Sequence, residues 1–243
     1  MSISLHNQIA LVTGANRGIG KEIVHSFLAH GAKKVYLAVR NTDSTKGLEE
    51  KYGKKVVTVS ADLSQPKTVK GLAEQAQDVT IVVNNAGVLT KTSPLDEHAE
   101  QSFMDEIDVN VLGLLRMVQA FTPILEKNGG GAFVQLNSIA SIISGTDLST
   151  YSASKAASYS FTLALKECLL PKNIQVISVH PGPILTDMGI DAGMADIAEP
   201  TSVVSEALVE ALNNGDFHVF PDTMAKEFGE AYRPYADKYI NGE

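Results

Sequence analysis

A tyrosine and a lysine four residues apart are the side chains in this sequence best suited to acid–base chemistry. Tyr151 and Lys155 lie in a segment with helical patterning, so both project from one helix face, within reach of one another. A free tyrosine has a pKa of about 10 and is a poor base near neutrality. A nearby ammonium favours the phenolate and lowers that pKa. The pair is therefore expected to exchange a proton with an alcohol or carbonyl oxygen near neutral pH, although such pairs also arise by chance.

The second chemical feature is a glycine-rich loop that directly follows the first predicted strand and opens a helix. Its sequence is Thr13-Gly14-Ala15-Asn16-Arg17-Gly18-Ile19-Gly20. The three glycines permit a tight turn, a close approach of the backbone to a phosphate, and close packing of helix on strand. The helix N-terminus offers free N–H groups and a positive dipole end to a pyrophosphate. The loop predicts dinucleotide binding in preference to a purely structural turn.

The Gly-x-x-x-Gly-x-Gly spacing and the motifs that follow it resemble the short-chain dehydrogenase/reductase (SDR) family. The further motifs, in chain order, are Asn84-Asn85-Ala86-Gly87, Asn110, Ser138, Tyr151-x-x-x-Lys155 and Pro181-Gly182-Pro183-Ile184-Leu185-Thr186. Each motif alone is modest, but together they span about residues 5 to 187 in the family's order and spacing. The length fits the branch of the family that lacks a separate C-terminal substrate domain.

The resemblance implies catalytic roles for four side chains. Tyr151 would exchange the proton with the substrate oxygen, and Ser138 would hydrogen-bond and polarise that oxygen, with Ser141 as a neighbouring alternative. Lys155 would also hold the nicotinamide ribose, and Asn110 would position a water that links Lys155 to bulk solvent. Asparagine is unfavourable in mid-helix, which separately hints at a role for Asn110. The four groups would support hydride transfer between nicotinamide C4 and a substrate carbon.

The resemblance also implies which residues bind the dinucleotide. Asp62 and Leu63 would flank the adenine, the Asn85 segment would line the ribose side, and Ile184 and Thr186 would meet the carboxamide. The full predicted set is Gly14, Asn16, Arg17, Gly18, Ile19, Gly20, Arg40, Asp62, Leu63, Asn85, Ala86, Gly87, Tyr151, Lys155, Pro181, Gly182, Ile184 and Thr186.

The end of the second predicted strand favours NADP(H) over NAD(H). An acidic residue there would bind the ribose hydroxyls of NAD, whereas a nearby arginine accepts the 2′-phosphate of NADP. The corresponding position is Val39, followed by Arg40, and Arg17 lies in the glycine loop. Two guanidinium groups without a carboxylate suit a phosphate dianion. Asp43 comes too late in the following loop to replace the missing acid.

The predicted substrate pocket is mostly apolar. Its residues are Leu89, Ile139, Leu148, Met188 and Met194. Such a lining favours a small aldehyde, ketone or alcohol over a free sugar or a dicarboxylate, although several of these side chains could equally belong to the core. The two methionines are flexible and would tolerate varied substrate shapes.

Three functions remain open. The first is an NADP(H)-dependent carbonyl reductase or alcohol dehydrogenase, and the second is a pathway enzyme such as a 3-oxoacyl thioester reductase. The segment 187–199 is shorter than the lid of fatty-acid reductases, and 219–222 lacks their C-terminal glycine signature. The net charge of −8 also disfavours an acidic carrier protein. The third function, a non-catalytic NADP-binding regulator, would have no need of Tyr151 and Lys155.

Apolar runs that alternate with helical segments must position these residues. The predicted strands are Ile9–Val12, Val35–Val39, Val56–Ser60, Val79–Val83, Ala132–Asn137 and Ile174–Val179, and the predicted helices include Ile19–Ala29, Val69–Ala76, Phe103–Leu125, Ser152–Leu170 and Pro200–Leu212. Short continuous apolar runs between helices indicate buried parallel strands. We expect an α/β fold, with one Rossmann-type doubly wound parallel sheet and helices on both faces. Without a linker, residues 1–243 form one domain, with a cofactor half at about 1–130 and a catalytic half at about 131–243.

Composition excludes several other classes of protein. The single cysteine, Cys168, excludes an intrachain disulfide and a cysteine-based zinc site, and the six histidines show no metal spacing. The acidic charge disfavours nucleic acid and anionic membranes. No run approaches 18 consecutive apolar residues, so no membrane span is expected. Residues 1–7 lack the pattern of a secretory signal, so the predicted compartment is the cytoplasm.

The chain is predicted to assemble as a homodimer or homotetramer. Members of the family commonly pair through two long helices, which correspond here to Phe103–Leu125 and Ser152–Leu170. Near the C-terminus, aromatic residues recur at helical spacing: Phe228, Tyr232, Tyr235 and Tyr239. They indicate either a terminal helix packed on the body, or a subunit contact or a cover over the active site.

Overall fold

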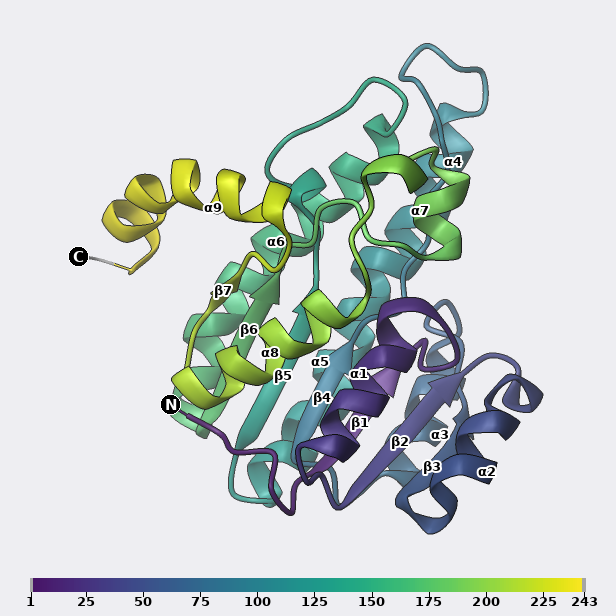
Figure 1. Cartoon of the computed structure of the whole chain (residues 1–243), viewed down its shortest axis with the longest axis vertical. Coiled ribbons are helices and arrows are strands. Elements are labelled where there is room, and N and C mark those ends of the chain that lie inside the picture. The colour runs from purple at the N-terminus through teal and green to yellow at the C-terminus, as the bar shows by residue number, and fades with distance from the viewer. Residues whose placement is uncertain (1, 242–243) are drawn as a thin grey trace.

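Seven parallel strands form one sheet in the computed structural model, which describes residues 2–241 (Figure 1). The strands are β1 (Ile9–Thr13), β2 (Lys34–Val39), β3 (Val56–Ser60), β4 (Ile81–Asn84), β5 (Gly131–Leu136), β6 (Ile174–Val179) and β7 (His218–Val219). Their order is β3-β2-β1-β4-β5-β6-β7, so the chain builds outward from β1 in one direction and then returns to build outward in the other. The point where the direction reverses lies between β1 and β4. This confirms the predicted doubly wound α/β fold.

Helices cover both faces of the sheet. They are α1 (Gly18–Ala29), α2 (Lys46–Tyr52), α3 (Pro66–Gln75), α4 (Ala99–Glu106), α5 (Gly113–Lys127), α6 (Ser149–Leu169), α7 (Asp187–Asp191), α8 (Ser202–Asn214) and α9 (Thr223–Ala236). Val12 of β1 packs with α1 and α8 on one face, whereas Leu11 packs with α3 and α5 on the other. Successive strand residues point to opposite faces, so a sheet covered on both faces needs unbroken apolar strands.

The predicted element boundaries differ from the structure in a few places. The apolar pattern did not predict three short elements: the strand β7 and the helices α2 and α7. Two to seven residues are too few to show a helical or strand periodicity. The predicted long helix begins earlier, at Ala99, and ends at Lys127. It contains a π-helical segment, Ile107–Leu112, between α4 and α5.

Among residues 2–241, the stretch Ala99–Lys127 is the one helical segment long and apolar enough to cross a membrane by length and composition. Leu114, Met117 and Phe121 of this stretch are fully buried in the core on one face of the sheet. A helix of a packed core carries such residues, so burial accounts for these three side chains.

The terminal helix α9 begins against the body and then leaves it (Figure 1). Midway along it, Gly229 lies so close to the Phe220 ring that a Cβ there would collide with it. Tyr232 reaches the Tyr159 hydroxyl at 3.1 Å. Farther along, Tyr235 and Tyr239 are 54% and 65% exposed. The helix therefore packs on the body through Gly229 and Tyr232, as the first of the two predicted alternatives has it, and its far end presents two exposed tyrosines.

Candidate active site

A cavity of about 520 Å³ lies at the carboxyl ends of the strands, where the winding direction reverses. Ligands of doubly wound folds bind at this position. Its lining includes, from the predicted site, Gly14, Asn16, Arg17, Gly18, Ile19, Arg40, Asp62, Leu63, Asn85, Ala86, Gly87, Tyr151, Lys155, Pro181, Thr186 and Met188. Predicted dinucleotide residues and the Tyr/Lys pair therefore share one cavity.

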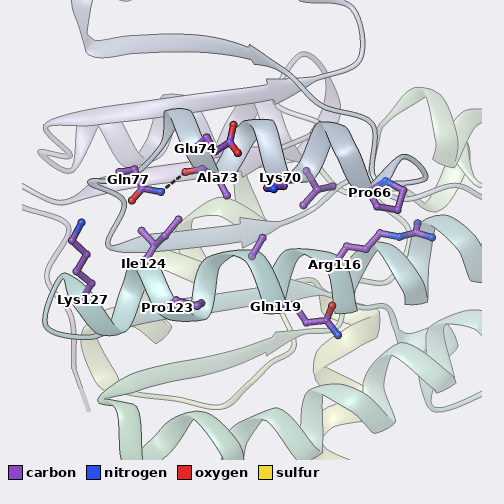
Figure 2. Close-up of a pocket in the computed structure, with 12 residues that line it drawn as sticks. Pro66, Lys70, Ala73, Glu74, Gln77, Arg116, Gln119, Pro123, Ile124 and Lys127 are labelled. Carbon is purple, nitrogen blue, oxygen red and sulfur yellow. Dashed lines mark hydrogen bonds between the residues drawn. The ribbon is translucent and has the colours of Figure 1, made fainter.

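A second hollow, of about 510 Å³, lies between α3 and α5, and it contains none of the predicted site residues (Figure 2). Arg116 at its edge is already engaged, donating to Asp108 at 2.7 Å and to the Leu63 carbonyl at 2.6 Å. The Gln77 amide, just beyond α3, donates to the Ala73 carbonyl of that helix at 2.7 Å. We therefore place the candidate active site in the first cavity.

Within the described residues, no group of three or more His, Cys, Asp or Glu side chains is placed to hold a metal ion.

The glycine loop turns the chain sharply from β1 into α1. Gly14 and Gly18 have φ angles of 66° and 52°, in the left-handed region where a side chain is strained. A Cβ on Gly20 would collide with the Gly14 carbonyl oxygen, so the helix can approach the strand only with glycine there. The helix α1 has no side-chain cap and no acidic residue in its first turn. Its first N–H groups are therefore available to an anion.

The Asn85 segment is tied directly to the end of β1. The Thr13 hydroxyl accepts hydrogen bonds from the backbone N–H groups of Asn85 and Ala86, both at 2.9 Å. The Asn85 amide donates to the Thr13 carbonyl at 2.8 Å. These bonds connect two loops that are more than 70 residues apart in sequence and that follow the neighbouring strands β1 and β4. Thr13, Asn85 and Ala86 all line the cavity.

Tyr151 and Lys155 are both buried on the first turns of α6. The Lys155 Nζ atom donates to the Leu136 carbonyl at 2.7 Å and lies 5.7 Å from the centroid of the Tyr151 ring. Burial raises the pKa of Tyr151 to about 12, opposed by a hydrogen bond with the Ser138 hydroxyl. Burial also lowers the pKa of Lys155 to about 8. The expectation of a Tyr151 pKa below its ordinary value is therefore wrong for the chain by itself, because desolvation of the buried phenol is the largest influence on that pKa.

The structure separates Ser138 from its neighbour Ser141. Ser138 lies two residues beyond β5, and its hydroxyl donates to the Pro181 carbonyl at 3.3 Å and accepts from the Ala140 N–H at 3.1 Å. The same hydroxyl lies near enough to Tyr151 to lower the pKa of the phenol. The Ser141 hydroxyl instead lies 3.0 Å from the Nδ1 atom of the buried His180. Ser138 is therefore the serine beside the phenol, whereas the Ser141 hydroxyl contacts His180 instead.

Asn110 lies in the π-helical segment, where the widened turn aims its amide across the fold. Its Nδ2 atom donates to the Val88 carbonyl and to the Ser154 hydroxyl, each at 2.9 Å, and its Oδ1 atom accepts from the Val88 N–H at 2.9 Å. A Cβ on Gly87 would lie 3.1 Å from Asn110 Oδ1 and 3.6 Å from Lys155 Nζ. Glycine at position 87 therefore keeps the space between these two polar groups open.

The two predicted phosphate-binding arginines are exposed and line the same cavity as Val39. Arg17 pairs with Asp187 of α7 at 2.9 Å, an exposed contact of little energetic weight. Asp43 does not line the cavity, and its carboxylate pairs with Lys46 at 2.8 Å. Asp43, the acid that the sequence raised as an objection to NADP(H), is therefore outside the lining and paired with a lysine.

The predicted substrate residues are only partly brought together. Met188 lines the cavity, next to Thr186, whose hydroxyl caps α7 by accepting from the Gly189 N–H at 3.1 Å. The remaining predicted site residues lie outside its lining: Gly20, Leu89, Asn110, Ser138, Ile139, Leu148, Gly182, Ile184 and Met194. Sequence reasoning missed other lining residues, among them Asn41, Ala61, Val109, Leu136, Asn137 and Asp187. Most of these follow strand ends, which is the signal that could have found them.

Comparison with known proteins agrees with this geometry. The short chain dehydrogenase family profile matches residues 8–195, a span that contains the glycine loop, Asn110, Ser138 and the Tyr/Lys pair. The chain belongs to this family. The match confirms the family that the motifs predicted, and the enzyme is an oxidoreductase that acts on hydroxyl or carbonyl groups.

Individual relatives span most of the enzyme. An NADP-dependent 3-hydroxy acid dehydrogenase from Schizosaccharomyces pombe is 28% identical, covering 90% of this chain and 92% of that protein. A 3-oxoacyl-[acyl-carrier-protein] reductase from Chlamydia muridarum is 33% identical, covering 77% and 78%. The crystal structure of a short chain dehydrogenase from Burkholderia cenocepacia in complex with NADP is 31% identical, with a TM-score of 0.88 and coverage of 98% and 99%.

Proposed function

We propose that this enzyme uses NADP(H) to interconvert a small, largely apolar aldehyde or ketone and its alcohol, with Tyr151 as proton donor and acceptor. The observation that carries the proposal is the shared cavity, in which Tyr151 and Lys155 lie together with the glycine loop and Arg40. One dinucleotide bound along the cavity would therefore bring its nicotinamide beside the phenol while its other end meets the arginines.

The residues present fit a phosphorylated dinucleotide. The uncapped N-terminus of α1 would bind the pyrophosphate, because its N–H groups and dipole favour an anion. Arg17 and Arg40 would bind the 2′-phosphate, for which Arg17 must exchange its exposed partner Asp187. The NADP dependence of the S. pombe relative and the NADP complex of the B. cenocepacia structure support this choice.

The catalytic roles follow from the chemistry of the buried pair. When bound, the reduced nicotinamide supplies the hydride that the carbonyl carbon accepts. Tyr151 gives its hydroxyl proton to the carbonyl oxygen, and with a pKa of about 12 it holds that proton throughout the neutral range. Ser138 donates a hydrogen bond to the same oxygen. Lys155 binds the nicotinamide ribose, and Asn110 fixes the Val88 backbone at the wall of the cavity.

A 3-oxoacyl thioester reductase is the second candidate, favoured by the 33% identity to the C. muridarum reductase. The short α7 and the net charge of −8 argue against an acidic carrier protein. NADPH oxidation against a panel of aldehydes, ketones and 3-oxoacyl thioesters tests both candidates. A clear preference for the thioesters would replace the first candidate with the second.

Cofactor preference is expected to follow the arginines. We predict that kcat/KM with NADPH exceeds that with NADH by at least about tenfold, or roughly 1.4 kcal/mol. The double variant Val39→Asp with Arg40→Leu adds an acceptor for the ribose hydroxyls and removes a phosphate partner, so it should shift the preference toward NADH. Steady-state kinetics with both cofactors measure this. Equal use of both cofactors by the unaltered enzyme would contradict the assignment.

Assembly is expected to involve the helical stretch Ala99–Lys127 together with α6. Met104, Leu112 and Phe161 on these helices are 56%, 40% and 41% exposed, although all three are large and apolar. Apolar side chains grouped on helices commonly mark subunit contacts. Light scattering at micromolar concentration should give at least twice the chain mass of 25.9 kDa. A measured mass of one chain would rule the dimer out.

A further inference from the structure

A buried histidine behind the candidate active site has no role in the mechanism above. His180 lies between the end of β6 and Pro181, and its side chain has no exposed surface. Its Nδ1 atom lies 3.2 Å from the Ser138 carbonyl oxygen and 3.0 Å from the Ser141 hydroxyl. Its Nε2 atom lies 2.7 Å from the Ser178 hydroxyl. Both ring nitrogens are therefore engaged, and one of them faces the backbone of the serine that we assign to the substrate oxygen.

The direction of the hydrogen bonds around His180 can be followed from α6. A hydroxyl group has one proton and so donates one hydrogen bond. Thr162 donates its proton to the Ser158 carbonyl, and Ser158 donates its own to Asn137 Oδ1, each at 2.8 Å. The Asn137 amide must therefore present its Nδ2 atom to the hydroxyls of Thr162 and Ser178, at 3.3 and 2.9 Å.

Ser178 passes this direction on to the imidazole. Because Ser178 accepts from Asn137, its proton is free for His180, whose Nε2 atom then acts as the acceptor. A neutral imidazole carries its proton on one nitrogen, so an accepting Nε2 atom leaves the proton on Nδ1. Burial lowers the pKa of His180 to about 3, which keeps the ring neutral near neutral pH. The Nδ1–H group is therefore a donor that faces Ser138.

The Ser138 carbonyl lies where several donors converge. Besides the His180 ring, the Ser141 N–H donates to it at 2.9 Å, and so does the Ser141 hydroxyl. The opposite tautomer of His180 would place a nitrogen lone pair 3.2 Å from this oxygen, which is an unfavourable contact between two acceptors. The Pro181 carbonyl accepts from the Ser138 hydroxyl at 3.3 Å and from the Ile139 N–H at 3.0 Å. The chain after β6 therefore holds Ser138 through a side chain as well as through the backbone.

We propose that His180 is a positioning residue for the reaction: its Nδ1–H group holds the backbone of Ser138 and so sets where the Ser138 hydroxyl meets the substrate oxygen. The inference rests on the proposed role of Ser138. It adds that the orientation of this serine is determined from α6, by hydrogen bonds that run through Asn137 and Ser178 to the ring. A small displacement of a group that contacts the reacting atoms lowers turnover strongly.

The decisive pair of variants is His180→Leu and His180→Asn. Leucine removes both ring nitrogens and leaves an apolar side chain beside the rings of Tyr159 and Phe220. We expect His180→Leu to lower the turnover of carbonyl reduction by at least about tenfold, with NADPH affinity within about twofold of the unaltered enzyme. Asparagine can place an amide N–H where Nδ1–H stood, so His180→Asn should recover most of the loss. A merely structural role predicts the reverse order, because leucine suits the aromatic surroundings better than asparagine.

Two comparisons isolate the path through Ser138. His218→Leu removes a neighbouring histidine whose Nε2 atom lies 2.6 Å from the Tyr159 hydroxyl, and it should keep turnover within about twofold. In a Ser138→Ala background, His180→Leu should cause no further loss, because the group that it positions is gone. Losses that multiply in the double variant, or unaltered turnover in His180→Leu, overturn the proposal.

The tautomer can be measured without an activity assay. Long-range proton–nitrogen NMR spectra of the unaltered enzyme should show His180, assigned from its contacts with the Phe220 ring, with its proton on Nδ1. A proton on Nε2 overturns the proposal even if no His180 variant folds. Ser138→Ala separates the two ideas: retained turnover there would reject the proposed role of Ser138 itself, whereas lost turnover there with an unaffected His180→Leu enzyme rejects only the role of His180.

Discussion

Replacing Tyr151 with phenylalanine is expected to reduce the turnover of carbonyl reduction by at least about 10³-fold. In the proposed mechanism the buried phenol gives a proton to the substrate oxygen, whereas Ser138 would orient that oxygen but could not replace the proton. Affinity for NADPH should change little, because the phenol is not required to hold the dinucleotide. Stopped-flow and steady-state NADPH oxidation, with a parallel fluorescence titration of NADPH, measure both quantities.

A matched control is available on the same helix. Tyr159 is also buried on α6, and its hydroxyl lies 2.6 Å from Nε2 of His218, away from the candidate cavity. Tyr159→Phe should therefore retain most of the turnover, although it loses a buried hydrogen bond and some stability. If Tyr151→Phe turned over like the unaltered enzyme, another group would have to donate the proton, and the reductase mechanism would be abandoned even if NADPH still bound.

Replacing Lys155 with alanine is expected to weaken both turnover and cofactor binding, each by at least about tenfold, because one ammonium serves the phenol and the ribose. The effect should depend on pH. Burial lowers the pKa of Lys155 to about 8, so the ammonium is present below that pH and is lost as the pH rises through it. In the unaltered enzyme, NADPH affinity should fall between about pH 7 and 9, and Lys155→Ala should abolish that fall.

This pH dependence can be separated from the titration of the phenol. The pKa of Tyr151, raised to about 12, leaves it protonated on both sides of pH 8, so a loss of reduction near pH 8 cannot come from the phenol. NADPH titrations at several pH values, with and without the Lys155 substitution, provide the measurement. An affinity that is flat from pH 6 to 10 in the unaltered enzyme would contradict the assigned role of Lys155.

The sequence by itself determined the fold class and two local motifs that line the cavity, the glycine loop and the Tyr/Lys pair. The run Val35–Val39 is apolar at every position, which is typical of a strand covered on both faces. Alternation with helices then predicts parallel strands, since a parallel pair needs a crossover connection. The glycine loop and the Tyr/Lys pair were also visible, because each depends on spacing within a single turn or helix.

Only the tertiary structure decided the features that depend on burial and on contacts between distant segments. The spacing of Tyr151 and Lys155 predicted a lowered pKa for the phenol, but its sign depends on desolvation by the surrounding fold, and burial raises that pKa instead. The pocket residues Leu89 and Met194 were assigned from their apolar type, whereas the lining depends on where loops direct their side chains. The partners of Asn110 showed no local signal either. Its hydrogen bonds to Val88 and Ser154 exist because the π-helical segment packs against α6 and against the chain after β4, and no pattern within one element contains those contacts.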